Sequence, residues 1–209
     1  MPSQKITEIK RIFTTRLDAL EHVLRIGEKH FPDANAFMDK RLAEDMFPFS
    51  SQIVIACNQA TAHALGALRE EMDMPVIGVV EPGARAAVAA TTRGHVGVIG
   101  TVGTIKSGAY ERAIRALDPD MLVTARACPL FVPLVEEGWT DREATRLIAQ
   151  EYLEPLTHEH IDTLVLGCTH YPLLKPLLHA RLGADVRLID SGEETAAETA
   201  RVMASRGLT

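Results

Sequence analysis

The sequence predicts an α/β fold in which a mostly parallel sheet is covered by helices on both faces. From Gln52 onward, short apolar runs alternate with amphipathic helical stretches, which is the pattern of repeated strand–helix units. The balance of 46% hydrophobic and 24% charged residues is that of an ordinary globular protein. The length of 209 residues suits one or two domains of this kind.

The expected strands are the apolar runs in the second part of the chain. β-branched residues favour strands, and Ile53, Val54 and Ile55 begin the first run. The six runs span residues 53–56, 76–80, 95–99, 121–124, 163–166 and 186–189. Apolar residues at helical spacing between them predict helices over residues 61–72, 104–117, 141–156, 172–182 and 193–204.

The first 50 residues show a helical pattern instead. An apolar stripe at spacings of three and four residues predicts a first helix, and its members are Ile6, Ile9, Phe13, Leu17, Leu20 and Leu24. Pro32 and Asp33 break this pattern. A second, shorter helix is expected over residues 36–46, and Pro48 stops it. Residues 1–50 are therefore expected to form a separate helical segment.

The charge and hydropathy of the chain argue against several classes of protein. The net charge is −6 and no run of Lys or Arg exceeds two residues, so a nucleic-acid-binding surface is not expected. No apolar run approaches the roughly 20 residues that cross a bilayer, and the first five residues lack the apolar core of a signal peptide. Three widely spaced cysteines suit a reducing compartment, so a cytoplasmic location is expected.

Two cysteines stand at the ends of predicted strands. Cys57 follows the run at 53–56, and Cys168 follows the run at 163–166. Backbone N–H groups at the start of a following helix favour anions, so they stabilise a thiolate or hold a carboxylate. Two such thiols in one cleft can act as acid and base on opposite faces of one carbon. Buried cysteines also serve as small hydrophobic residues, and spacing alone leaves both interpretations open.

Other residues carry weaker signals. Cys128 is flanked by apolar residues and is expected in the core. A zinc site is not expected, because the chain has no C-x-x-C pair and Cys168 with His170 forms only a fragment of such a site. The histidines expected to be ordinary surface groups include His63, His158 and His160.

A set of motifs from about residue 53 onward points to a known family. The most specific motif is LGCTHYP at residues 166–172. The others are VIACN at 54–58, PVIGVVEPG at 75–83, GVIGT at 97–101, TIKS at 104–107 with Tyr110, and ACPL at 127–130 with Val135 and Glu136. In these motifs the chain resembles the glutamate racemases of the aspartate/glutamate racemase superfamily.

The resemblance implies a fold, a reaction and a set of site residues. The fold is a parallel-sheet α/β sandwich, and the reaction is the interconversion of L- and D-glutamate for peptidoglycan synthesis. One thiolate takes the α-proton and an opposite thiol returns one, without pyridoxal phosphate, other cofactors or a metal. The implied catalytic residues are Cys57, Cys168, His170 and Glu136, and the implied substrate-binding residues are Asn58, Gln59, Thr101 and Thr169. Glutamate is the implied small-molecule partner and a homodimer the implied assembly, with no nucleic-acid or membrane partner.

The match to the family fails before Cys57. The family opens with an Asp-Ser-Gly motif whose aspartate assists the first cysteine, and no such motif precedes Cys57 here. Gln59 stands where the family usually has threonine. We therefore expect one complete racemase-like domain at residues 84–183 and a truncated one made of residues 51–83 and 184–209. The truncated domain is expected to hold a three-stranded remnant, whose strands are residues 53–56, 76–80 and 186–189.

The first 57 residues or so resemble a different family. Residues 41–49, followed by Gln52, are similar to a helical-bundle family known only as a domain of unknown function, and residues 13–31 fit its first helix. The two resemblances meet near residues 55–58, so we interpret the chain as a chimera. The N-terminal helices are expected to cover the sheet edge that the family's first strand would otherwise pair.

Several functional hypotheses are compatible with the sequence. The first is a glutamate racemase whose activity is impaired by the missing motif. The second is a racemase-derived chimera without turnover, and the third is a related superfamily enzyme that acts on another substrate. A helical binding module on a racemase-like scaffold is an alternative of a different class.

Overall fold

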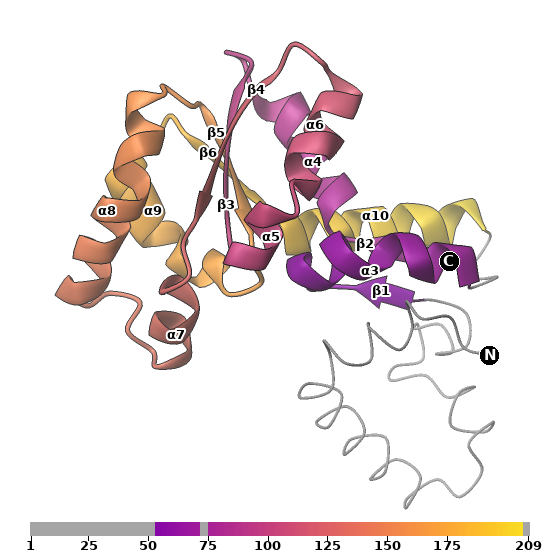
Figure 1. Ribbon diagram of the computed structural model, residues 1–209, viewed down its shortest axis with the longest axis horizontal. Helices are drawn as coiled ribbons and strands as arrows, with labels where there is room; N and C mark the ends of the chain where they lie inside the picture. The colour runs from indigo at the N-terminus through magenta and orange to yellow at the C-terminus, as the bar shows by residue number, and fades with distance from the viewer. Residues whose placement is uncertain (1–52, 72–74, 207–209) are drawn as a thin grey trace, which may run out of the picture.

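The computed structural model describes residues 53–71 and 75–206 (Figure 1). The helices expected within residues 1–50 lie outside the described residues, as does most of the sequence on which the chimera interpretation rests. Within the described ranges, no helix has the length and apolar character needed to cross a membrane.

All six predicted strands form, and they pair in parallel in two sheets. In the first sheet β1 (Ile53–Ile55) pairs with β2 (Val76–Gly78). The second sheet has the order β4-β3-β5-β6. Its strands are β3 (His95–Gly100), β4 (Leu122–Ala127), β5 (Thr163–Gly167) and β6 (Arg187–Asp190). The predicted fold class, α/β with parallel sheets, is confirmed.

Helices cover both faces of the four-stranded sheet. Figure 1 shows α8 (Glu143–His158) and α9 (Lys175–Leu182) on one side, and α4 (Val80–Ala90) and α6 (Ala109–Leu117) on the other. Successive side chains of a strand point to opposite faces. In β5, Leu164 and Leu166 therefore pack with α8 and α9, whereas Val165 packs with α4 and α6. All three side chains are fully buried, so β5 lies at the centre of the core.

The last strand does not lie where the sequence placed it. The expectation that residues 186–189 join the strands at 53–56 and 76–80 is wrong, because β6 pairs with β5 from Thr163↔Arg187 to Leu166↔Asp190. Burial explains the difference, since Val186 lies in the same apolar cluster as α8 and α9. The sheet that contains β1 thus has two strands among the described residues. The division of the chain into residues 84–183 and residues 51–83 with 184–209 stays a prediction.

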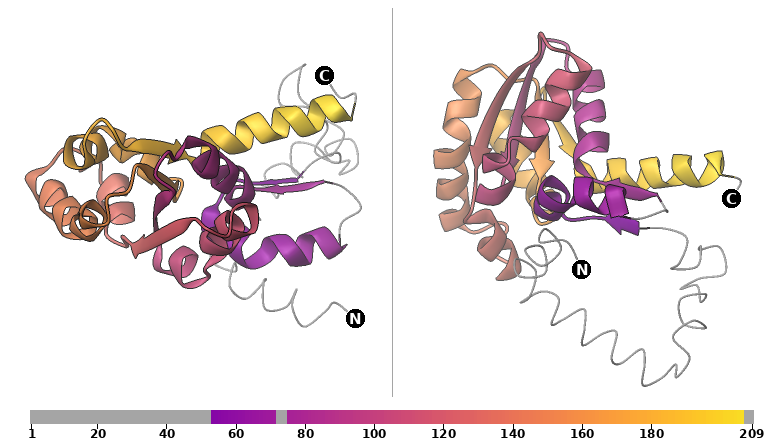
Figure 2. Two further views of the ribbon diagram at one scale, coloured as in Figure 1. Left: turned by 90° about the horizontal axis from the view of Figure 1, so that it is seen from above. Right: turned by 45° about the vertical axis from the view of Figure 1, so that its right-hand side comes forward.

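The helix α10 (Ser191–Ser205) connects the two sheets. It begins directly after β6, packs against α4 and contacts β2 of the first sheet. Figure 2 shows it extending well beyond the four-stranded sheet. Asp190 caps this helix, because its Oδ1 accepts hydrogen bonds from the backbone N–H groups of Gly192 at 2.9 Å and Glu193 at 3.4 Å.

The helices differ from the prediction at several places. The expected strand-then-helix order after residue 53 is confirmed by α3 (Asn58–Glu71). The expected helix at 104–117 is split into α5 (Val102–Lys106) and α6, because Gly108 between them has a φ of 62°. The expected helix at 172–182 begins with a short 3₁₀ turn, η2 (Tyr171–Leu174), which precedes α9. Two helices were not predicted, α4 and α7 (Phe131–Glu136).

Candidate active site

A cavity of about 280 Å³ lies where β1, β3, β4 and β5 end. The carboxyl ends of parallel strands are where α/β proteins bind ligands. The cavity is lined by Cys57, Asn58 and Gln59 after β1, by Thr101 and Thr104 after β3, by Pro129, Val132 and Pro133 after β4, and by Gly167, Cys168, Thr169 and His170 after β5. Every predicted site residue except Glu136 therefore lines one cavity, and Glu136 reaches it through His170.

The two thiols enter the cavity from different sheets. Cys57 is half-buried between β1 and α3, and its carbonyl accepts a hydrogen bond from Thr61 N at 2.9 Å in the first turn of α3. Cys168 is buried after β5, and its carbonyl accepts from Tyr171 N at 3.1 Å. Each cysteine is thus held by its backbone at the point where a strand turns into a helix, as the sequence predicts.

Cys168 has an imidazole and a carboxylate beside it. Its Sγ lies 3.7 Å from His170 Nδ1, and His170 Nε2 lies 3.1 Å from Glu136 Oε1. Because a carboxylate only accepts hydrogen bonds, the Nε2 atom of His170 carries a proton toward Glu136. In the neutral imidazole, Nδ1 is then free to accept the thiol proton, and the three groups together can move a proton to and from Sγ.

The cavity is chemically asymmetric between its two thiols. Among the residues that the structure describes, neither an Asp nor a Glu lines the cavity. Cys168 is therefore connected to a carboxylate through His170, whereas no described cavity-lining carboxylate stands beside Cys57.

Polar side chains from both sheets meet across the cavity. The Thr101 hydroxyl lies 3.1 Å from Gln59 Oε1, to which it can donate, and it accepts from Thr104 N at 3.4 Å as the cap of α5. A Cβ atom at Gly103 would lie only 2.8 Å from the Gln59 side chain, so a larger residue there would displace the end of that side chain. Thr169 is exposed at the other side of the cavity.

The third cysteine has no part in this cavity. Cys128 is fully buried, which confirms the prediction that it lies in the core. Burial raises the pKa of the Cys128 thiol to about 12, although the nearby charge of Arg126 acts in the opposite direction. His63, His158 and His160 are exposed, as predicted.

Part of the cavity wall was not predicted from the sequence. Thr104 lines it although it is almost completely buried; the TIKS motif at 104–107 and the spacing of three residues from Thr101 were the signals for it, but it was not predicted as a site residue. Pro129, Val132 and Pro133 form the apolar wall. They were missed because the short helix α7 has no periodic apolar pattern by which it could be predicted.

The parallel sheets and the thiol-lined cavity at their carboxyl ends define an α/β protein with a candidate two-cysteine active site. The model of the Asp/Glu/Hydantoin racemase family matches residues 43–199. The chain therefore belongs to the Asp/Glu/Hydantoin racemase family.

Relatives of known class are similar over the same part of the chain. A glutamate racemase of Geobacter metallireducens is 56% identical over 151 residues, which are 72% of this chain and 56% of the relative. A glutamate racemase of Syntrophus aciditrophicus is 53% identical over 157 residues, which are 75% of this chain and 58% of the relative. The chain thus spans little more than half of the length of these relatives.

Solved structures show the same fold. A glutamate racemase isoform of Bacillus anthracis superimposes with a TM-score of 0.74 at 48% identity, over 78% of this chain and 60% of that one. The glutamate racemase of Francisella tularensis, solved in complex with D-glutamate, superimposes with a TM-score of 0.70 at 34% identity, over 76% of this chain and 59% of that one.

Proposed function

We propose that the chain interconverts L- and D-glutamate without a cofactor, with Cys57 and Cys168 as the acid and the base. The observation that carries this proposal is that both thiols line one cavity of about 280 Å³. A thiolate on one side of the substrate takes the α-proton and becomes a thiol. The thiol on the other side gives its proton to the resulting carbanion and becomes a thiolate. One turnover therefore exchanges the protonation states of the two thiols and leaves the total charge of the site unchanged.

The reaction needs strong assistance because the α-hydrogen of a carboxylate is weakly acidic. General acid–base groups supply about 10²–10⁴-fold each when they are well placed. His170 and Glu136 give this assistance at Cys168. The remaining stabilisation comes from hydrogen-bond donors around the carbanion and the carboxylates.

The donors around the cavity suit a dicarboxylate amino acid. We assign the substrate contacts to the side chains of Asn58, Gln59, Thr101 and Thr169, which come from both sides of the cavity. The likeness to the Francisella tularensis racemase, whose structure holds D-glutamate, supports glutamate as the substrate. In this role the protein would supply D-glutamate for peptidoglycan in the cytoplasm, and it would assemble as a homodimer.

The asymmetry of the cavity bears on the rate. With His170 and Glu136 beside Cys168 and no described carboxylate beside Cys57, proton transfer at Cys57 is the slower of the two half-reactions. We therefore propose a racemase of impaired turnover. It should exchange the α-proton of one glutamate enantiomer with solvent faster than it converts that enantiomer into the other.

The test is solvent deuterium exchange at the α-carbon of L- and D-glutamate, followed by NMR. Exchange in the parent chain that disappears in Cys168→Ala and persists in Cys128→Ala supports the proposal. Absence of exchange with both enantiomers, in a sample shown by circular dichroism to be folded, contradicts it and favours a racemase-derived protein without turnover. Exchange of both enantiomers at the parent rate in Cys168→Ala contradicts the assignment of the thiols, because Cys57 alone can exchange only the enantiomer whose α-proton faces it.

A further inference from the structure

Asn58 is held by hydrogen bonds from two distant parts of the chain. Tyr110 donates its hydroxyl to Asn58 Oδ1 at 2.5 Å, and Asn58 Nδ2 donates to Ser191 Oγ at 3.1 Å. Each of these three residues is only 2% exposed. Buried polar groups are costly unless they are bonded, so these partners stabilise one another where α3, α6 and α10 meet.

The chain of bonds continues to the strand that leads to Cys168. Ser191 accepts from Asn58 and donates its own proton to the carbonyl oxygen of Leu166 at 3.1 Å. We call Tyr110, Asn58, Ser191 and the Leu166 carbonyl the Asn58 relay. With its oxygen facing a donor and its nitrogen facing an acceptor, the Asn58 amide has one orientation. The bond to Ser191 uses one of the two N–H groups of the amide, and the same orientation sets the direction of the other.

The relay links the two strand ends that precede the thiols. Asn58 directly follows Cys57, and Leu166 lies two residues before Cys168. A single sequence of hydrogen bonds therefore runs from the end of β1 to the end of β5. Because the two strands belong to different sheets, no ladder of backbone hydrogen bonds joins these ends directly.

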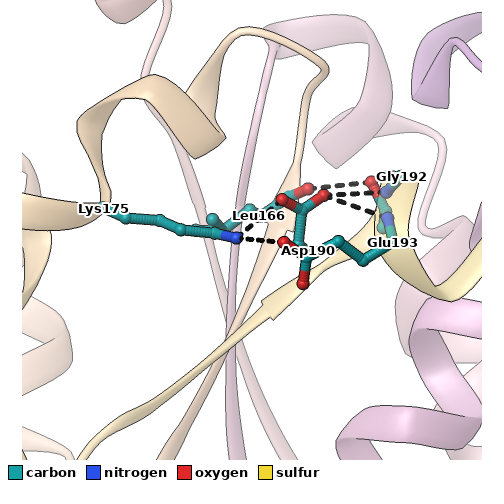
Figure 3. Close-up of polar contacts among 6 residues, drawn as sticks. Leu166, Lys175, Asp190, Gly192 and Glu193 are labelled. Carbon is teal, nitrogen blue, oxygen red and sulfur yellow. Dashed lines mark hydrogen bonds and ion pairs between the residues drawn. The ribbon is translucent and has the colours of Figure 1, made fainter.

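A charged cluster fixes the position of Ser191. Lys175 Nζ lies 2.8 Å from Asp190 Oδ2 and 2.8 Å from Glu193 Oε1. Figure 3 shows the Lys175 side chain reaching Asp190, whose carboxylate also accepts from the backbone of Gly192 and Glu193. Lys175 thus ties the start of α9 to the start of α10, where Ser191 is the first helical residue.

Two glycines make room for the ring of Tyr110. A Cβ atom at Gly83 would lie 3.3 Å from the Tyr110 hydroxyl and ring, and one at Gly167 would lie 3.3 Å from the other side of the ring. The ring is therefore closely packed, so its hydroxyl has little freedom to leave Asn58. Replacing Tyr110 by Phe keeps this packing and removes the hydrogen bond alone.

We propose that Tyr110 and Ser191 are positioning residues. They fix the orientation of the Asn58 amide and the position of the Cys57 loop relative to Cys168. This inference rests on the proposed function in so far as the positioned site is a glutamate site. Reacting groups displaced by about 1 Å lose about 10²-fold in rate. A relay that fixes the two loops relative to each other is therefore expected to act on the chemical step.

The test compares Tyr110→Phe and Ser191→Ala with Thr195→Val in the full chain. Thr195 is buried one turn further along α10, and its hydroxyl donates to the Ser191 carbonyl, so Thr195→Val deletes a hydroxyl and spares the side-chain bonds of the relay. Both relay variants are expected to lower kcat for glutamate by about tenfold to a hundredfold, with a smaller change in KM. The double variant is expected to lose less than the product of the two single losses, because the relay acts as a unit.

A second measurement does not depend on turnover. The rate of Cys57 alkylation by iodoacetamide, followed by mass spectrometry, is expected to change in both relay variants and to stay at the parent value in Thr195→Val. If the parent chain shows no racemisation, the proposed function fails and the alkylation rates alone decide the positioning role. Unchanged kcat and unchanged alkylation in the relay variants would overturn the inference. If Ser191→Ala does not fold, Tyr110→Phe decides by the same criteria.

Discussion

The carboxylate of Glu136 lies 3.1 Å from Nε2 of His170, although the two residues are 34 positions apart in the chain. Glu136 ends α7 and His170 follows β5, so the contact exists only because α7 packs beside η2. The carboxylate accepts a hydrogen bond from Nε2 and so orients the imidazole with Nδ1 facing Cys168. The two contacts connect Glu136 to the Cys168 thiol through His170, and its assistance to that thiol is part of the proposed function.

Glu136→Gln is expected to lower the rate of α-proton exchange by at least about tenfold, because general acid–base assistance contributes about 10²–10⁴-fold and the variant weakens part of it. Glu137→Gln is the matched control, since Glu137 is the adjacent exposed residue and does not line the cavity. NMR exchange assays on both variants check the prediction. Equal rates in Glu136→Gln and Glu137→Gln would show that the contact has no catalytic role.

The three cysteines are expected to differ sharply in reactivity. With a pKa of about 12, on the order of 10⁻⁴ of the Cys128 thiol is ionised at pH 8, and the side chain is also inaccessible. Cys57 lines the cavity and is half-buried, so iodoacetamide should modify it first. Peptide mass spectrometry after timed alkylation of the native protein measures the order. Modification of Cys128 before Cys57 would contradict the placement of both thiols.

Asp162 is expected to stabilise the fold in a pH-dependent way. Burial raises the pKa of its carboxyl, but hydrogen bonds from the Thr91 hydroxyl, from the backbone and hydroxyl of Thr92 and from the Arg93 backbone outweigh this and bring the pKa well below its usual value. Asp162→Asn should cost about 1–3 kcal/mol at pH 7, because an amide nitrogen cannot accept these bonds.

The sign of this pH dependence follows from the lowered pKa. The stabilisation is fully present above the unfolded-state pKa of about 4 and is lost as the pH falls through the lower native-state pKa. Urea unfolding of the parent and of Asp162→Asn should therefore show a constant difference in the free energy of unfolding between pH 8 and pH 5. The difference should shrink below about pH 4. A difference that widens on acidification would rule out this account.

Two glycine-to-alanine substitutions are expected to have opposite effects. A Cβ atom at Gly167 would lie 2.7 Å from the Ile99 carbonyl, so Gly167→Ala must shift the strand end that carries Cys168. At Gly66 in α3 no atom lies within 4 Å of a new Cβ, and alanine there should stabilise the helix by about 0.5–1 kcal/mol. Thermal unfolding of the two variants checks the signs. Gly167→Ala should also lose exchange activity, which Gly66→Ala should keep.

Strand–helix alternation was enough to predict the main elements of the described fold. β-branched and apolar runs predicted every strand, and Cys57 and Cys168 were expected at strand ends, where they lie. The helix α4 was missed because Val79 and Val80 were taken as the end of a strand. Glu81, Pro82 and the alanine-rich stretch that follows favour a helix, and proline is tolerated in its first turn.

The pairing of β6 could not be predicted from residues 186–189 alone. An apolar run of this kind fits either sheet, and the choice depends on which partner strand offers a matching buried face. The Asn58 relay could not be predicted from residues close together in the sequence either, because Asn58 and Ser191 are 133 positions apart. Such contacts arise from the topology, which brings α10 back across both sheets.

The distance between Asn58 and Ser191 along the chain has a consequence for biosynthesis. Domains fold as their residues leave the ribosome, from the amino-terminal end onward. A nascent chain that ends before β6 already contains both cysteines of the cavity but lacks the strand beside β5 and the helix that bonds Asn58. The hydrogen bonds of Ser191 in the Asn58 relay therefore form only after α10 is made, so the nascent chain holds both thiols before the relay that connects their strand ends is complete.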